Sequence, residues 1–241
     1  RCQPVTGVQT CALPISVPDD ALGPLVQGLA DLRRWQPGQL VVHTCGAKGV
    51  GILKPAQALG AIPLAIHPAM TFSGMSVDLA RLVGCPMAIT APTIALPIAQ
   101  ALVVELGGEP FVLEEASRPA YHAALAHGAN HLVTLVSQAV RALQAAGVND
   151  GAATMRPLLT AALDRTLREG GDNALTGPVA RGDAGTVATH LAALEALRNE
   201  AGAPLSDVVE SYRALARATL ARREGCLPPE QTAALHKVLD P

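Results

Sequence analysis

Aromatic and charged side chains are both scarce in this sequence. Phe, Trp and Tyr make up 2% of its 241 residues and charged residues 16%, with 18 basic against 20 acidic side chains and a formal net charge of -2. Without a surplus of basic residues the protein has no broad field to attract a phosphate backbone or an anionic membrane. We therefore expect no nucleic-acid partner and no membrane partner.

Long apolar runs are also absent, because no run reaches the ~18 residues that a membrane-spanning helix requires. Yet 49% of the residues are hydrophobic and the mean hydropathy is +0.29, largely through alanine. This is enough apolar material for one large domain or two modest ones, so we do not expect a disordered chain.

The cysteines form no CxxC pair that would indicate zinc or a redox motif. There are five, and they are scattered: Cys2, Cys11, Cys45, Cys85 and Cys226. Unpaired, dispersed cysteines are typical of a reducing compartment, so we expect a cytoplasmic protein.

The first residues do not read as native sequence. Residues 5–15 read VTGVQTCALPI, which is the codon-by-codon translation of a common sequencing adapter. We treat residues 1–16 as a foreign segment outside the fold. We expect native sequence to begin near Val17, in a protein that has lost its upstream part.

The first half of the chain has the pattern of an α/β domain. An amphipathic helix is expected over residues 19–34, and helical segments around 52–59, 76–83 and 94–106. Between them lie short apolar runs that we predict as strands: 39–44, 62–66, 86–90 and 110–113. Continuous rather than alternating apolar runs are typical of strands buried on both faces, which indicates a parallel sheet.

After residue 115 the sequence has helical periodicity throughout. The predicted helices span residues 118–145, 154–168, 183–199, 205–223 and 229–239. The expected fold class is α/β, with a partial, truncated Rossmann-like parallel sheet followed by an all-α carboxyl-terminal domain. The predicted divisions are the foreign segment at 1–16, the Rossmann-like part at 17–115 and the helical domain at 116–241.

A glycine-rich turn follows the first predicted strand of the native region. Gly46, Gly49 and Gly51 have the spacing GxxGxG, whereas the dinucleotide fingerprint is GxGxxG. We therefore interpret the turn as a loop at a strand end and not as a pyrophosphate cradle. A dinucleotide fingerprint would have stood in the lost upstream part.

Two polar loops just after predicted strands are candidates for chemistry, since open α/β sheets bind ligands there. The first is His43-Thr44-Cys45-Gly46 and the second begins at His67-Pro68. His67 could polarise a substrate oxygen, or it could only cap its strand through backbone bonds. For His43 the capping role is favoured.

The first helix of the second half carries a polar stripe. At 100° per residue, one stripe contains His127, Asn130, Thr134, Ser137 and Arg141. Solvated helix surfaces usually carry Lys and Glu, and this stretch has neither. We therefore favour a water-filled crevice beside the stripe, the alternative being a solvated helix surface. His127 and His131 have the i, i+4 spacing of metal ligands, but a third ligand is not evident, so we expect no metal site.

Residues 175–183, LTGPVARGD, form the sharpest local signal in the second half. Asp183 is a good N-cap, which places Arg181 at a helix amino terminus where it could hold a carboxylate or phosphate. The alternative is that Arg181 and Asp183 pair and brace the turn. We expect His190, on the apolar side of the following helix, to be a satisfied core residue.

In combination these motifs resemble the Rossmann-like proteins with a DUF2520 carboxyl-terminal domain. The resemblance rests on HTCG at 43–46, HPAMTF at 67–72, YHAALAHGANH at 121–131 and LTGPVARGD at 175–183. Such proteins look like members of the 6-phosphogluconate-dehydrogenase-like superfamily, which includes prephenate dehydrogenases, pyrroline-5-carboxylate reductases and ketopantoate reductases. The resemblance implies an NAD(P)-dependent oxidoreductase, with NADP or NAD as cofactor.

The resemblance also implies roles for residues. The His-Pro after a strand is similar to a prephenate dehydrogenase segment whose His contacts the substrate hydroxyl, which implies a catalytic role for His67. Relatives carry a catalytic Lys on the first helix of the second domain, and this chain has no Lys there. His127 or His122, with Asn130, would take that role. Substrate-binding residues are then Arg181, Asp183, Tyr121 and Thr176, and cofactor-binding residues His43, Thr44 and Gly46.

The implied substrate is a small carboxylate-bearing carbonyl, imine or alcohol, and the implied partner is a second copy bound through the helical domain. The fragment itself could bind cofactor poorly and be inactive. Two other functions stay open: a non-catalytic nucleotide- or metabolite-binding protein of the same fold, and a His-ligated metal hydrolase.

Overall fold

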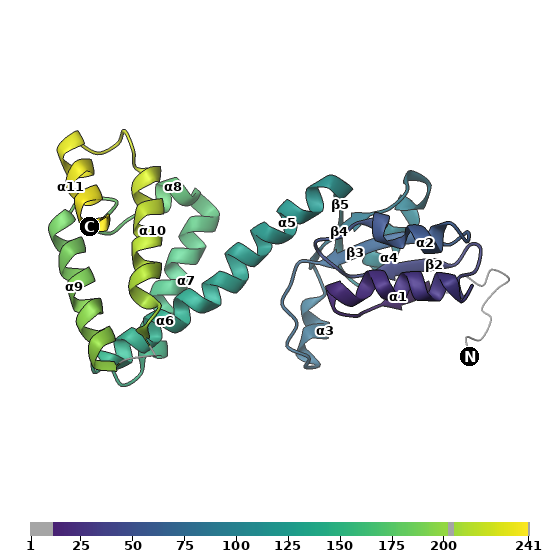
Figure 1. The fold of residues 1–241 in the computed structure, drawn as a ribbon, viewed down its shortest axis with the longest axis horizontal. Coiled ribbons are helices and arrows are strands. Elements are labelled where there is room, and N and C mark those ends of the chain that lie inside the picture. The colour runs from purple at the N-terminus through teal and green to yellow at the C-terminus, as the bar shows by residue number, and fades with distance from the viewer. Residues whose placement is uncertain (1–11, 202–204, 241) are drawn as a thin grey trace. The chain divides into compact units, whose positions relative to one another are not determined.

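The computed structural model describes residues 12–201 and 205–240, and the chain divides into two compact units, residues 1–129 and 130–241 (Figure 1). Each unit is described by itself. The predicted foreign segment up to residue 11, with Cys2 and Cys11, lies outside the described residues.

A five-stranded sheet forms the centre of the first unit, with the strands in chain order. They are β1 (Ala12–Ile15), β2 (Leu40–His43), β3 (Ile62–Pro68), β4 (Pro86–Thr90) and β5 (Glu109–Val112). The prediction that residues 1–16 stand outside the fold was wrong for residues 12–15. These apolar residues pair in parallel with β2, and Ile15 is buried, because they cover an edge of β2 that would otherwise expose unpaired backbone groups.

One strand pair departs from the predicted parallel sheet. The β1–β2, β2–β3 and β4–β5 pairs are parallel, but β4 runs antiparallel to β3. The only helix between those two strands is α3 (Val77–Arg81). Parallel neighbours are usually joined by a crossover helix that packs on the sheet, whereas antiparallel neighbours need no such helix.

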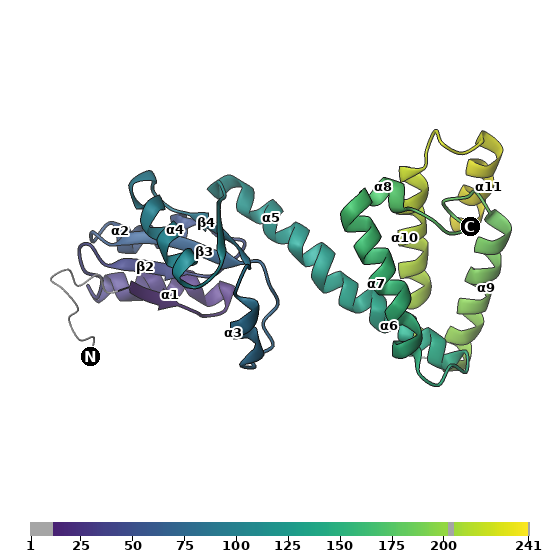
Figure 2. The ribbon, with the colours of Figure 1, turned by 180° about the vertical axis from the view of Figure 1, so that it is seen from behind.

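Helices cover both faces of the sheet. One face carries α1 (Asp19–Asp31), the 3₁₀ turn η1 (Val50–Leu53) and α2 (Lys54–Gln57), and the other carries η2 (Thr93–Ala95) and α4 (Leu96–Glu105). Leu22 and Val26 of α1 pack on Val41, while Ala99 and Val103 of α4 pack on the opposite face. Accordingly α1 lies in front of the sheet in Figure 1 and α4 in Figure 2.

The helix predicted at residues 118–145 is interrupted. A 3₁₀ turn, η3 (Glu115–Ser117), leads into α5 (Arg118–Leu125), then a π-helical turn, η4 (Ala126–Asn130), and α6 (His131–Ala145). The division between the two units falls after residue 129. By this criterion α5 belongs to the first unit, beyond the boundary predicted at residue 115.

The second unit is helical in its described part. It consists of α6, α7 (Gly151–Glu169), α8 (Gly171–Ala174), α9 (Ala184–Ala201), α10 (Val208–Arg222) and α11 (Pro229–Leu239). Buried Val187, Leu191, Val209 and Leu235 bring α9, α10 and α11 around one apolar core. The predicted fold class, an α/β sheet followed by helices, is confirmed.

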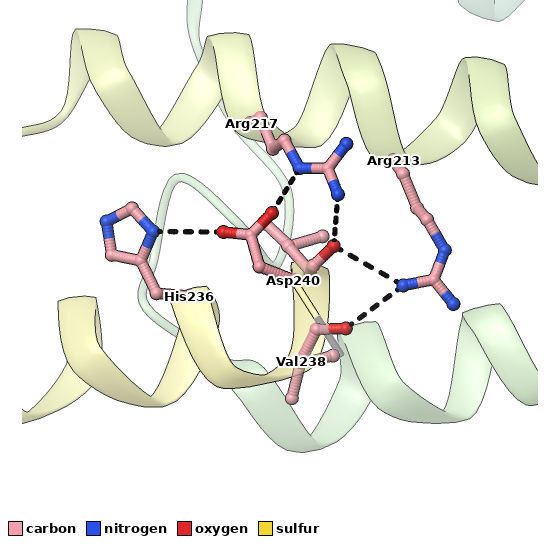
Figure 3. A network of polar contacts seen from close by, with 6 residues as sticks. Arg213, Arg217, His236, Val238 and Asp240 are labelled. Carbon is pink, nitrogen blue, oxygen red and sulfur yellow. Dashed lines mark hydrogen bonds and ion pairs between the residues drawn. The ribbon is translucent and has the colours of Figure 1, made fainter.

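Two arginines of α10 hold the carboxyl end of α11 (Figure 3). Arg217 donates from Nε to Asp240 Oδ1 at 2.5 Å and from Nη2 to the Leu239 carbonyl at 2.6 Å, and Arg213 donates to the Val238 carbonyl at 3.3 Å. Cations satisfy the last carbonyls of a helix and oppose the negative end of its dipole. This network attaches the C-terminal end of α11 to α10.

Within the described residues, none of the helices is both long and apolar enough to cross a membrane.

Candidate functional site

Three aromatic rings meet at the end of β3. His67 Nδ1 lies 3.0 Å from the Tyr121 hydroxyl, and the His122 ring stands edge-on to His67 with centroids 5.9 Å apart. His67 comes from the sheet, whereas Tyr121, 54 residues further along the chain, and the next residue, His122, come from α5. The structure thus brings three of the predicted site residues into one cluster within the first unit.

Gly46 provides the space for this cluster. A Cβ atom at this position would lie 2.8 Å from Nε2 of His67 and 2.6 Å from Cδ2 of His122. Contacts below 3.0 Å are not tolerated, so both imidazoles rest directly on the Gly46 backbone. Gly46 therefore contributes to the site by leaving space for the two rings.

Burial controls the protonation of His67. Loss of solvent, with smaller contributions from His122 and Arg118, lowers the pKa of His67 to about 4. Burial raises the pKa of the Tyr121 hydroxyl, which the guanidinium of Arg118 partly offsets. At neutral pH the pair is therefore a neutral imidazole bonded to a neutral phenol.

His43 has a structural role in the turn that follows β2. It is 0% exposed, its Nδ1 accepts the Cys45 N–H at 3.2 Å, and its Nε2 lies 2.9 Å from the Gly49 carbonyl. An acceptor Nδ1 leaves the proton on Nε2, which donates to that carbonyl. Both ring nitrogens are used inside the turn, so the predicted contact of the His43 ring with a cofactor is not available; Thr44 beside it is exposed.

The glycine-rich turn wraps a carboxylate of its own chain. Glu115 Oε1 accepts the Gly51 N–H at 2.8 Å, and Cβ atoms at Gly49 and Gly51 would each lie 2.5 Å from the Glu115 side chain. The two glycines thus allow another group to lie directly against the backbone of the turn, and that group is the Glu115 side chain. The turn as it stands does not fit a pyrophosphate, since a bound anion would meet this carboxylate.

Arg118 is the residue that the sequence analysis missed. It is 0% exposed and donates to the Cys45, Ala65 and Ala88 carbonyls at 3.1, 2.8 and 3.1 Å and to Thr90 Oγ1 at 2.7 Å. The only local signal would have been an arginine at the start of a helix. Its acceptors lie 28 to 73 residues away in sequence, so no local pattern reveals them.

His127 and Asn130 lie in the π turn η4. The predicted stripe assumed an uninterrupted α-helix, but a π turn contains an extra residue and rotates everything after it. The stripe of His127 and Asn130 with Thr134 is therefore not the continuous one that was predicted. Single π turns are frequent at functional sites, and the roles proposed for His127 and Asn130 remain predictions.

In the helical unit Asp183, predicted as a substrate-binding residue, uses both carboxylate oxygens to cap α9. Its Oδ1 accepts the Thr186 N–H at 2.9 Å and its Oδ2 the Thr186 hydroxyl at 2.5 Å, and these bonds lower the pKa of Asp183. Arg181 is exposed, and in the described part of the chain no ion pair within 4 Å joins it to Asp183. The guanidinium stays accessible and forms no close ion pair with Asp183, although its charge also helps to lower the pKa of Asp183.

A second His–Tyr pair lies in the same unit. His190 Nδ1 is 2.9 Å from the Tyr212 hydroxyl, and both residues line a cavity of about 830 Å³ with Thr176 and mostly apolar side chains. The expectation that His190 sits in the core was wrong, because it is exposed. Three residues after Val187, His190 lies on the same side of α9, but at the edge of the core, where it borders the cavity and stays exposed.

The cluster of His67, Tyr121 and His122 combines groups that hold and move protons. A neutral imidazole with one nitrogen bonded to a phenol can donate from the other nitrogen and be resupplied by the phenol. Such an arrangement suits reactions in which an oxygen or nitrogen atom of a substrate gains or loses a proton.

Two family models match the chain. One is a Rossmann-like domain, over residues 4–68, and the other is the domain of unknown function DUF2520, over residues 85–219. The chain belongs to the DUF2520 family. The DUF2520 match begins at the end of the loop before β4, upstream of the predicted start of that domain at residue 116. The resemblance drawn from the motifs is confirmed.

Solved structures share the fold of this DUF2520 chain at low sequence identity. Protein TM1727 from Thermotoga maritima is 21% identical with a TM-score of 0.62, over 92% of this chain and 81% of that one. BF3122 from Bacteroides fragilis, assigned as an NADP oxidoreductase, is 22% identical with a TM-score of 0.66, over 87% and 75%.

A more distant similarity reaches an enzyme solved with its cofactor. The pyrroline carboxylate reductase of Plasmodium falciparum, with NADP bound, is 12% identical with a TM-score of 0.52, over 88% of this chain and 76% of that one. No curated protein sequence matches the DUF2520 chain. The fold is thus one that NAD(P)-dependent oxidoreductases use.

Proposed function

We propose that this chain belongs to an NAD(P)-dependent oxidoreductase that acts on a small carboxylate-bearing carbonyl, imine or alcohol. The observation that carries the proposal is the 3.0 Å contact between His67 Nδ1 and the Tyr121 hydroxyl at the end of a strand. Ligands of open α/β sheets bind at strand ends. Relatives of the same fold that are named NADP oxidoreductase and pyrroline carboxylate reductase support the class of reaction.

In this proposal a nicotinamide cofactor would supply the hydride, and the chain's own residues handle the proton. The Tyr121 hydroxyl donates to His67 Nδ1, which leaves the ring proton on Nε2. Nε2–H polarises the substrate oxygen or nitrogen and passes its proton on as Nδ1 takes the proton of Tyr121. Solvent then restores the phenol.

Within the helical unit by itself, we propose Arg181 as a residue that binds an anionic group. Its guanidinium is exposed, forms no close ion pair with Asp183, and precedes the amino terminus of α9. A planar guanidinium binds a carboxylate through two parallel hydrogen bonds. Thr176 belongs to the same turn and lines the cavity of the helical unit.

We further propose a homodimer formed through the helical unit. Large apolar side chains are exposed there: Leu132 and Val133 on α6, and Leu158, Leu163 and Leu167 on α7. Groups of exposed apolar residues mark interaction surfaces. Sedimentation velocity should show a dimer that Leu158→Lys with Leu167→Lys weakens, and a monomeric wild-type chain would contradict it.

Steady-state NADPH oxidation with pyrroline carboxylate and a set of small 2-oxo acids tests the catalytic proposal. His67→Asn and Tyr121→Phe should each lower kcat by about 10²- to 10⁴-fold, the range for a positioned acid or base, with little change in Tm. Tyr212→Phe is the matched control, because it removes the hydroxyl of the other His–Tyr pair. NADPH binding without turnover of any substrate would favour the non-catalytic alternative.

A further inference from the structure

A buried cation stands at the first residue of α5. The four hydrogen bonds of Arg118 reach the segment after β2, the strand β3 and the strand β4, and all four acceptors are neutral. The Glu115 carboxylate attracts the guanidinium electrostatically but accepts none of these four bonds. Burying a charge without a bonded counter-charge is costly unless it is fully hydrogen-bonded. An apolar side chain would fill the same place without that cost, so this position calls for a role beyond packing.

Small side chains on the sheet make room for this guanidinium. Ala65 and Ala88 lie on the same face as His67, because residues two apart on a strand and residues paired across strands share a face. Thr90, paired with Ala65, supplies the fourth acceptor and itself donates to the Leu113 carbonyl at 2.6 Å. The start of α5 is therefore attached to the sheet at a defined point beside His67.

The attachment of Arg118 also fixes the site residues on the same helix. Tyr121 and His122 follow Arg118 by three and four residues, which puts all three on one face of α5. When the guanidinium fixes the first turn, the phenol and the second imidazole are fixed one turn later. Movement of the first turn by 1 Å would change the His67–Tyr121 contact by a comparable amount.

We infer that Arg118 is a positioning residue: by binding three segments of the sheet it places the Tyr121 hydroxyl on His67 and the His122 ring over Gly46. The inference rests on the proposed function for its catalytic consequence. Its structural consequence, the geometry of the three rings, can be measured without any turnover.

The charge of Arg118 acts on the same rings. The groups that influence His67 are His122, Arg118 and Asp19, and burial contributes most to lowering its pKa. The guanidinium opposes the imidazolium and favours the ionised phenol of Tyr121. The first effect keeps His67 neutral, and the second eases loss of the Tyr121 proton.

The experiment follows the His67 ring by NMR and the reaction by kinetics. Arg118→Lys keeps the charge but cannot reach all four acceptors, so the first turn should shift and His67 become more exposed. Its titration midpoint should rise by about one pH unit. With a turned-over substrate, kcat should fall about 10- to 100-fold, as for a misplaced reacting group, with KM little changed.

Two further variants complete the design. Thr90→Val removes a single acceptor. It should raise the His67 titration midpoint and lower kcat, each by less than Arg118→Lys does. Glu115→Gln is the control: it changes the first side chain of η3, just before α5, and the amide oxygen can still accept the Gly51 N–H. It removes a carboxylate that acts on Arg118 but is not among the groups that influence His67, so the His67 midpoint should stay unchanged.

A folded Arg118→Lys with wild-type midpoint and kcat would overturn the inference. If Arg118→Lys does not fold, Thr90→Val decides by the same criteria. If no substrate is turned over, the proposed function fails and the midpoint alone decides on Arg118.

Discussion

Gly51 donates its backbone N–H to Glu115 Oε1 over 2.8 Å, so a carboxylate from the start of η3 occupies the glycine-rich turn. The glycines at 49 and 51 are explained by this contact, since a side chain at either place would overlap Glu115. The glycine-rich turn and the start of η3 are thereby held together.

Replacing Gly49 by Ala should lower the free energy of unfolding by about 1 kcal/mol, at the low end of the overpacking range, because the exposed Glu115 can swing away. In a Glu115→Ala background the same replacement should cost less, and urea denaturation of the four proteins gives the coupling. Gly28→Ala in α1 is the control. Nothing lies within 4 Å of its added methyl, so it should be neutral or stabilise by up to about 1 kcal/mol. Additive costs at Gly49 and Glu115 would contradict this account.

Removing the carboxylate should not create a cofactor site. We expect Glu115→Ala to leave the NADPH affinity of the chain unchanged in a fluorescence titration, because the spacing of the turn is not that of a pyrophosphate cradle. A tenfold or greater gain in affinity would instead show that Glu115 competes with the cofactor phosphates at Gly49 and Gly51.

Acid should destabilise the protein partly through His67. Its pKa is about 4 when folded and near 6.5 when unfolded, so between these values the unfolded state binds more protons. Stability is then fully present above pH 6.5 and is lost as the pH falls toward 4. His67→Asn should show a smaller fall in Tm between pH 7 and pH 5 than the wild type, and an equal fall would show that His67 stays solvated. His43, whose pKa burial also lowers, contributes in the same direction in both proteins.

Substitutions of Arg181 and of Asp183 should affect different properties, KM in the first case and Tm in the second. Asp183→Ala removes the cap of α9 and should lower Tm by a few degrees without changing substrate KM. Arg181→Ala should leave Tm unchanged and raise KM, and Arg181→Lys, which keeps the charge but not the planar fork, should raise it less. An unchanged KM in Arg181→Ala would end the assignment of Arg181 to the substrate anion.

Local sequence patterns were sufficient for the element types and the fold class. The apolar runs at 39–44 and 62–66 became strands buried on both faces, and the helical periods of the second half became helices with nearly the predicted bounds. The N-cap at Asp183 was also readable, because a cap is formed by residues only three apart. Each of these features depends on neighbours in the chain, so the sequence alone determines it.

Tertiary structure decided what depends on distant partners. The reversal of β4, the pairing of residues 12–15 with β2 and the π turn at 126–130 leave no periodic signal in their own segments. The candidate site has the same property: His67 was a candidate from its strand end, but the Tyr121 hydroxyl on its Nδ1, the Gly46 backbone beneath it and the buried Arg118 meet it only through folding. Hydrogen bonds between residues 28 to 73 positions apart have no counterpart in local composition, so the geometry of the site had to come from the folded chain.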